Sequence, residues 1–297
     1  MSGEAKTEVE ARRARVALAA VIAASILIVA GQALAVAALG DASDSVERLV
    51  ARAMESSQTI AGAAIGAVGQ ALLVVPLLLL FDAAAARTGG RMDRFRLLVM
   101  IGPPVFAIAQ VITAIGVDQV AQDFVAGTPI SGTAGEDRAE ELFANSTLVQ
   151  ISTGIGFAGI LSIVFGTVYS ALWGMRTGLL TRFWGTLGMA FGAFLFLGSF
   201  VGSPIGLLGT LFFLLHVALV AGGRWPGDQP PAWGAGVAVP WDERDTERFG
   251  GASPPPEEEL ARPEDFEGSG RDATEDEDDR SGRRENKRKR KRKQRGR

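Results

Sequence analysis

The chain contains no cysteine among its 297 residues, and only one histidine and one tyrosine. Without cysteine it can form neither a disulfide bond nor a thiolate site for zinc or an iron–sulfur cluster. It also lacks His-Glu-x-x-His, Gly-x-Ser-x-Gly, a phosphate-binding glycine loop and paired aspartates within an apolar segment. The sequence therefore predicts a protein that is not an enzyme, with no catalytic residue, no metal and no cofactor.

Charged residues are missing from long parts of the chain. Asp, Glu, Lys and Arg are absent from residues 16–40, 56–81, 97–117, 148–175 and 183–223. A hydrocarbon core of about 30 Å is crossed by roughly 20 helical residues, so these stretches predict an all-α transmembrane helix bundle. The last stretch is too long for one span and contains Gly202-Ser203-Pro204, a turn signal.

Splitting that stretch at the turn yields six predicted spans: 16–39, 59–81, 97–117, 148–172, 183–201 and 205–221. For residues 183–221, a long tilted helix or a re-entrant pair stays open as an alternative. The first span is longer than the 7 to 15 apolar residues of a secretory signal. We therefore expect it to be retained as an uncleaved helix.

Basic residues indicate the orientation, because Lys and Arg near span ends collect on the cytoplasmic side. With the N-terminus inside, ten basic residues lie on that side and three on the other. The ten are Lys6, Arg12, Arg13, Arg15, Arg87, Arg91, Arg94, Arg96, Arg176 and Arg182; the three are Arg48, Arg52 and Arg138. Both termini are expected in the cytoplasm, and the composition suggests a bacterial plasma membrane.

Two loops between spans carry similar strings, "RTGGRMDRF" at 87–95 and "RTGLLTRF" at 176–183. Each follows another shared string, "IGAVG" at 65–69 and "IGFAG" at 155–159. Matches in register suggest a duplicated hairpin with the same direction in both copies. Because Gly and Ala are abundant, chance similarity stays open as well.

The run "SALWGMRTGLLTRFWGTLGMAFGAFLFLG", residues 170–198, resembles a loop and following helix in a broad set of uncharacterised bacterial multi-pass membrane proteins. These carry an Arg-(Ser/Thr)-Gly-Leu-aliphatic-x-Arg-(Trp/Phe) loop before a glycine-rich span. The family pattern usually has proline before the second arginine, where this chain has Thr181. The resemblance implies a helical membrane bundle and no catalytic activity.

The predicted spans contain no ionisable carboxylate or amine, which argues against an ion-coupled pump. They do contain polar side chains: Gln32, Gln70, Gln110 and Gln150, one in each of the first four spans, and His216 in the sixth. Gln32, Gln70, Gln110 and His216 are candidates for a polar pocket in the bundle. Hydrogen bonds between helices are the other interpretation, which we favour from the sequence alone.

Short segments within and between the spans also carry signals. Val46, Leu49, Val50 and Met54 recur at helical spacing after Asp44, a suitable N-cap, and predict an amphipathic helix that lies on the outer surface of the membrane, or a helical extension. Pairs of glycine four residues apart, as at Gly62 and Gly66 or Gly188 and Gly192, predict close helix packing. The pair Pro103-Pro104 predicts a kink in the third span.

The sequence changes character after residue 222. We predict a cytoplasmic segment at 1–15, the bundle at 16–222, and a disordered tail at 223–297 with an acidic block at 257–279 and a polybasic block at 283–297. The basic block could engage anionic lipid, non-specific nucleic acid or its own acidic neighbour. Its candidate binding residues are Arg283, Arg284, Lys287, Arg288, Lys289, Arg290, Lys291, Arg292 and Lys293.

Two functions follow from these patterns. The leading hypothesis is a non-enzymatic membrane protein whose polybasic tail engages anionic lipid or other polyanions at the cytoplasmic surface. The alternative is a permease or channel that carries a small neutral solute through the bundle. Partners besides the lipid bilayer, including a second copy of the chain, stay open.

Overall fold

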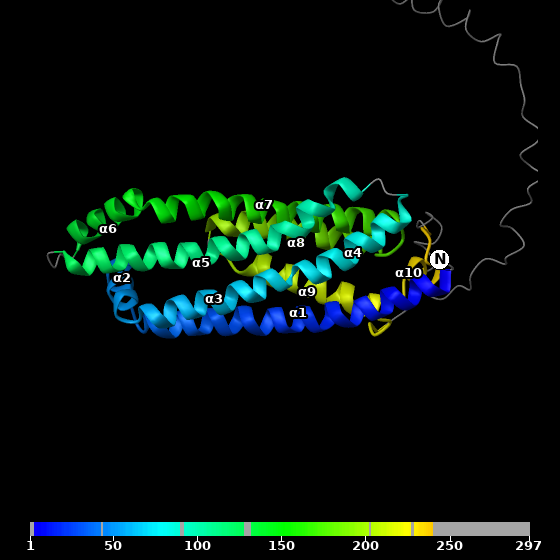
Figure 1. The fold of residues 1–297 in the computed structure, drawn as a ribbon, viewed down its shortest axis with the longest axis horizontal. Coiled ribbons are helices and arrows are strands. Elements are labelled where there is room, and N and C mark those ends of the chain that lie inside the picture. The colour runs from blue at the N-terminus through cyan, green and yellow to red at the C-terminus, as the bar shows by residue number, and fades with distance from the viewer. Residues whose placement is uncertain are drawn as a thin grey trace, which may run out of the picture. The chain divides into compact units, whose positions relative to one another are not determined.

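The computed structural model describes residues 3–42, 44–89, 92–127, 132–201, 203–226 and 229–239, and within these ranges every regular element is a helix (Figure 1). One is a short 3₁₀ turn, Asp93–Phe95. The α-helices are α1 (Gly3–Leu39), α2 (Ser45–Met54), α3 (Ser56–Leu72), α4 (Val74–Arg87), α5 (Arg96–Ala126), α6 (Thr133–Asn145), α7 (Thr147–Arg176), α8 (Arg182–Val201), α9 (Ile205–Ala221) and α10 (Pro231–Ala235).

Five helical stretches in the described ranges are long and apolar enough to cross a membrane. They are Glu8–Leu39, Ser56–Arg87, Arg96–Ala126, Thr147–Arg176 and Arg182–Phe200. The sixth predicted span corresponds to α9, a shorter apolar helix of 17 residues. The chain is therefore a multi-pass membrane protein with an all-α bundle in a lipid bilayer.

The long helices form a ring around α4. In sequence around the ring, α1 packs on α3, α3 on α5, α5 on α7, α7 on α8, α8 on α9, and α9 on α1, while α4 contacts four of them. Leu77, Leu80 and Phe81 of α4 are buried in the main apolar core. Figure 1 shows α2 and α6 at one end of the bundle and α10 with the N-terminus at the other; we call these the α2 end and the α10 end.

The second predicted span is broken where the sequence analysis expected a continuous helix. The chain leaves α3 after Leu72 and starts α4 at Val74. Pro76 explains the break, because proline has no N–H to donate to the carbonyl four residues earlier, here that of Leu72. By contrast, α5 continues as one helix through Pro103 and Pro104.

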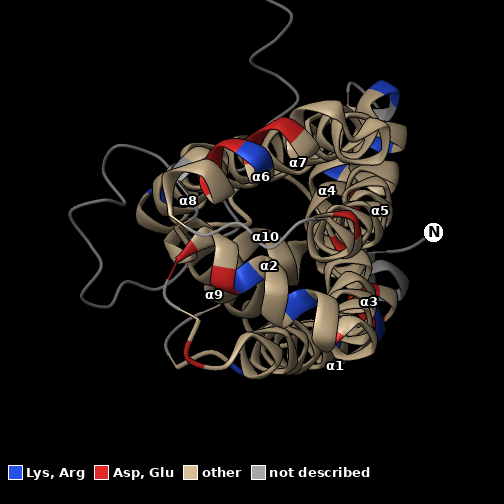
Figure 2. Cartoon of the chain, turned by 90° about the vertical axis from the view of Figure 1, so that its left-hand side faces the viewer, with Lys and Arg blue, Asp and Glu red and all other residues tan. Residues whose placement is uncertain are grey.

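The α2 end is built from the amphipathic segment that the sequence predicted. Asp44 caps α2 by accepting a hydrogen bond from the Glu47 N–H at 2.7 Å. Leu49 is buried with Val120 and Phe124 of α5 and with Ala139 of α6, so the apolar face of α2 packs on protein. Figure 2 shows charged residues on α2 and α6 at this end, while the long helices are mostly uncharged.

The repeated Arg-Thr-Gly string has a local structural explanation. It ends α4 and α7 in the same way: the hydroxyls of Thr88 and Thr177 donate to carbonyls of the last turn, at 3.0 and 2.8 Å. Gly89 and Gly178 follow with φ of 64° and 77°, the left-handed conformation that favours glycine after a helix. The requirements of helix termination thus account for the shared letters, whether or not the hairpins are a duplication.

Candidate functional site: a polar pocket at the α2 end

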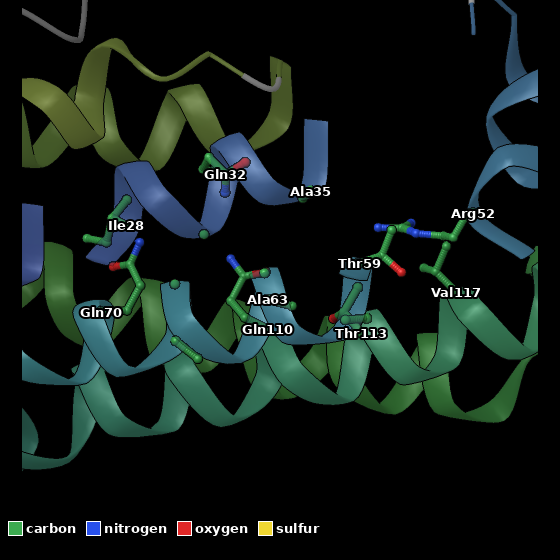
Figure 3. Close-up of a pocket in the computed structure, with 15 residues that line it drawn as sticks. Ile28, Gln32, Ala35, Arg52, Thr59, Ala63, Gln70, Gln110, Thr113 and Val117 are labelled. Carbon is green, nitrogen blue, oxygen red and sulfur yellow. The ribbon is translucent and has the colours of Figure 1, made fainter. Parts of the chain in front are cut away.

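A cavity of about 170 Å³ lies among α1, α3 and α5, with α2 beside it (Figure 3). Three of the four residues that the sequence nominated for a polar pocket line it: Gln32 from α1, Gln70 from α3 and Gln110 from α5. In Figure 3, the side chains of Gln70 and Gln110 extend into the space between the helices, and Arg52 reaches toward it from α2. The cavity is smaller than a typical drug-sized site, so it suits a small solute.

Small residues create this space while holding the helices together. A Cβ atom added at Gly31 would lie 2.5 Å from the backbone oxygen of Gly62, so α1 and α3 touch backbone to backbone at this point. Gly66, one turn further along α3, faces open space within 4 Å and lines the cavity. Both glycines of the predicted packing pair lie against Gly31, since its added Cβ would also lie 2.7 Å from the Gly66 nitrogen. They differ in where their own Cβ would point: at Gly62 it meets the Gly31 backbone oxygen, and at Gly66 it meets open space.

The three cavity glutamines are not used to join helices. No hydrogen bond connects the side-chain amides of Gln32, Gln70 or Gln110 to another residue in the described ranges, although Gln70 is largely buried. Gln150 of α7 behaves differently, because its amide donates to the Ala144 carbonyl. Each cavity amide thus keeps two N–H donors and a carbonyl acceptor for a bound molecule.

Two hydroxyls add acceptors to the same wall. Thr59 donates to the Ser56 carbonyl at 2.9 Å, and Thr113 donates to the Ala109 carbonyl at 2.8 Å. Because each hydroxyl hydrogen is committed to its own helix, each oxygen faces the cavity mainly as an acceptor. The pocket can therefore recognise both donors and acceptors on a solute.

Arg52 is the charged group of the pocket, and the sequence analysis assigned it only to a loop. Its Nε is buried without a hydrogen-bond partner in the described part of the chain. Burial lowers the pKa of Arg52 from its ordinary value, and the negative charge of Asp118 acts in the opposite direction. No ion pair within 4.0 Å joins Arg52 to any described residue.

A sequence signal for Arg52 exists in retrospect. Arg52 follows Leu49 by three residues, and residues three apart share a helix face. Since Leu49 belongs to the apolar side of the predicted amphipathic helix, the same spacing places Arg52 on the side that faces the bundle. The sequence analysis used Arg52 only as an orientation signal and missed its position beside the pocket.

His216, the fourth nominated residue, does not line this cavity. Its ring stacks on Trp184 with centroids 3.5 Å apart and meets Trp225 edge-on at 4.4 Å. Within the described ranges, no group of three His, Cys, Asp or Glu side chains is placed to hold a metal ion. The surroundings of His216 are those of an aromatic packing cluster near the end of α9.

A second arginine joins several segments at the α10 end. The Arg87 side chain is fully buried and donates to both carboxylate oxygens of Glu10, at 2.8 and 2.9 Å. It also donates to the carbonyls of Ala83 and Ala232, and its guanidinium lies 5.6 Å from the centre of the Trp233 ring. The sequence analysis treated Arg87 as an orientation signal and missed this network.

The chain after α9 adds further hydrogen bonds at the α10 end. Trp233 is buried, and its indole N–H donates to the Leu179 carbonyl at 2.9 Å. The Val239 N–H donates to the Thr177 carbonyl at 3.1 Å. Ordered structure therefore extends to Val239, past residue 223, where we predicted that the tail begins.

A second cavity, of about 380 Å³, lies at the α10 end beside Glu8, Glu10, Gln229 and Trp233. Two of its polar groups are already engaged: Glu10 pairs with Arg87, and the Gln229 amide donates to the Val220 carbonyl at 2.9 Å. It is thus a weaker candidate for recognition than the pocket at the α2 end, whose glutamines and arginine have no such partners.

The nominated polyanion-binding residues, Arg283 to Lys293, lie outside the described residues, as does the acidic block before them. The chain matches no known protein-family model, no curated protein and no solved structure. No family or homologue is thus identified for the chain, and the resemblance of residues 170–198 stays a prediction from the sequence. Functional inference depends on the geometry of the bundle.

Proposed function

We propose that this membrane protein binds a small, hydrogen-bonding solute in the pocket at the α2 end and is not an enzyme. One observation carries the proposal: three glutamines from three different helices line one cavity, and their amides make no hydrogen bond within the described ranges. Polar groups inside a membrane bundle are costly unless they are satisfied. A solute that pairs with them offsets that cost.

We further propose a topology with six spans, in which α9 is the sixth and both termini are cytoplasmic. The excess of basic residues on the side of the N-terminus supports this orientation. It puts the α10 end in the cytoplasm and the α2 end outside, in a bacterial plasma membrane. The pocket then takes its solute from the exterior.

The protein is proposed to act as a facilitator for that solute. The pocket lies near the α2 end, and the Arg87 network with Trp233 seals the α10 end. Passage would require the α10 end to open, as in alternating access. Absence of ionisable residues from the apolar stretches of the spans favours passive movement over ion coupling.

Solute binding and flux test the proposal. Purified protein in proteoliposomes would be screened with small polar solutes, and Gln70→Leu and Gln110→Leu would be compared with Gln150→Leu. We expect flux to fall at least tenfold in the first two variants only, because both amides line the path of the solute, whereas the Gln150 amide is occupied outside the pocket. Equal behaviour of all three variants, in folded protein, would remove the proposed site.

A second function is proposed for the tail, on sequence grounds. The 283–297 block carries Lys and Arg in nearly continuous succession, and each basic residue held near an anionic membrane contributes about 1 kcal/mol. Full-length protein and a version ending at Arg280 would be purified at low and moderate salt. Nucleic acid or anionic lipid that accompanies only the full-length form, and leaves with salt, is the expected result; identical companions for both forms would contradict it.

A further inference from the structure

We propose that the solute of the α2-end pocket is a small organic carboxylate, whose anionic group is bound by Arg52 and whose polar remainder contacts Thr113 and Gln110. This inference rests on the proposed solute-binding function and specifies its chemistry. The sequence pointed to a neutral solute because no charge lies within the apolar spans. The tertiary fold brings a charge to the pocket from α2, outside the spans.

Arg52 is a cation that forms no ion pair with any carboxylate in the described part of the chain. Its Nε is buried and unpartnered, and no described carboxylate lies within ion-pair distance. A partly buried charge is costly unless it is paired and hydrogen-bonded. Arg87, in the same bundle, is paired and hydrogen-bonded in this way: it donates to a carboxylate and to two backbone carbonyls.

The electrostatic surroundings favour one anion rather than several. Asp118 is the acidic group that interacts with Arg52, but its Oδ1 is itself buried without a hydrogen-bond partner. The aspartate therefore helps to keep Arg52 charged without occupying its N–H groups. A monoanion can bind there, whereas a second negative charge on the solute would be repelled by Asp118.

The shape of the guanidinium selects a carboxylate. Arginine presents planar N–H groups that match the two oxygens of a carboxylate in a bidentate pair. A phosphate dianion calls for more donors than one arginine supplies beside an aspartate. The small residues Gly31, Ala35, Gly62 and Ala63 that line the rest of the cavity suit a short carbon chain.

The order of polar groups along the cavity sets the length of the solute. Thr59 and Gln70 lie eleven residues apart on α3, which is about 16 Å along a helix axis. Figure 3 places Arg52 and Thr59 at one end, Thr113 and Gln110 between, and Gln70 at the other end. A chain of a few carbons bound to Arg52 therefore reaches Thr113 and Gln110 but not Gln70.

The test compares 4-hydroxybutyrate with 4-hydroxybutyramide, which have nearly the same shape and differ in charge. Binding of each would be measured by calorimetry to the full chain in lipid nanodiscs. We expect the carboxylate to bind at least tenfold more tightly than the amide, and Arg52→Gln to reduce its affinity to that of the amide. Arg48→Gln, on the same helix but outside the pocket lining, is the matched control and should leave the ratio unchanged.

The outcomes separate the inference from the function beneath it. If both probes bind equally and lose affinity in Gln110→Leu, the pocket binds a solute, and the inference that it selects a carboxylate is wrong. If neither binds at millimolar concentration, both proposals fail for solutes of this size. The two probes are also compared on the unaltered protein, which needs no substitution. Equal binding there contradicts the inference even if Arg52→Gln misfolds.

Discussion

Two arginines at opposite ends of the bundle have opposite surroundings. Arg87 at the α10 end has its side chain fully buried and is surrounded by Glu10, two backbone carbonyls and the Trp233 ring. Arg52 at the α2 end has a buried Nε with no partner in the described part of the chain. The first arrangement holds helices together, and the second leaves hydrogen-bonding capacity for a ligand. The contrast teaches that burial of a charge does not reveal its role; its partners do.

The largest expected effect comes from breaking the satisfied arginine. Arg87→Met leaves Glu10 without its partner and removes the contacts to Ala232, so we expect a loss of about 3–5 kcal/mol in the free energy of unfolding, as for other broken buried pairs. Thermal or denaturant unfolding in detergent measures it. The double variant Glu10→Gln with Arg87→Met should recover part of the loss. A single variant as stable as the parent would show that the network does not hold the α10 end.

Next in size is the close contact between α1 and α3. A Cβ at Gly62 would lie 2.7 Å from the Gly31 backbone oxygen, so Gly62→Val should force the helices apart and cost about 1–3 kcal/mol, the usual range for overpacking. The control is Gly66→Val, whose Cβ meets nothing within 4 Å. That variant should fill the pocket and weaken solute binding while leaving the unfolding transition nearly in place. Reversed effects of the two variants would contradict the assignment of packing and lining faces.

A smaller effect is expected at the cap that orients Arg52. Asp44→Ala removes the acceptor for the Glu47 N–H, and loss of such a cap costs about 1 kcal/mol. Because α2 also packs through Leu49, it should remain helical but more mobile, so solute affinity should fall more than global stability. Hydrogen exchange of residues 45–54 gives the local readout. Asp44→Asn, which can still accept a hydrogen bond, is the conservative control and should behave like the parent.

The smallest change in stability is predicted for Arg52 itself. Arg52→Met removes a cation that forms no hydrogen bond or ion pair with the described residues, and it keeps an apolar stem. The free energy of unfolding should therefore stay within about 1 kcal/mol of the parent or rise. This is the counterpart of Arg87→Met and should be measured under the same conditions. A destabilisation as large as that of Arg87→Met would mean that Arg52 is structural, and the comparison between the two ends would fail.

Much of the helical framework could be predicted, because its signals are local. Lack of charge located the five membrane-length helices, Gly202-Ser203-Pro204 located the break between α8 and α9, and Asp44 located the start of α2. The break at Leu73 was missed, although Pro76 was present in the predicted span. At Pro103 and Pro104 the sequence predicts a kink; α5 continues as one helix through both prolines, and the kink itself stays a prediction.

The candidate site was predictable only in part. Gln32, Gln70 and Gln110 stood out as polar residues in apolar spans, but nothing in their positions showed that they would share one cavity while His216 would lie between Trp184 and Trp225. Arg52 was not nominated, because its role depends on α2 turning back over the pocket. Trp233 and Glu10 lie far along the chain from Arg87, so no local spacing in the sequence indicated that these residues would contact each other.

The sequence by itself determined that this chain is a multi-pass helical membrane protein, which stretches form its membrane-length helices, and which polar residues enter its spans. Those properties follow from hydrophobicity, capping and backbone chemistry, which act over a few neighbouring residues. Only the tertiary structure decided which arginine is paired with Glu10 and which faces a cavity, and which glutamines meet. Such pairings depend on helix packing between distant segments, where a glycine against a backbone oxygen or a break at Leu73 sets which side chains face each other.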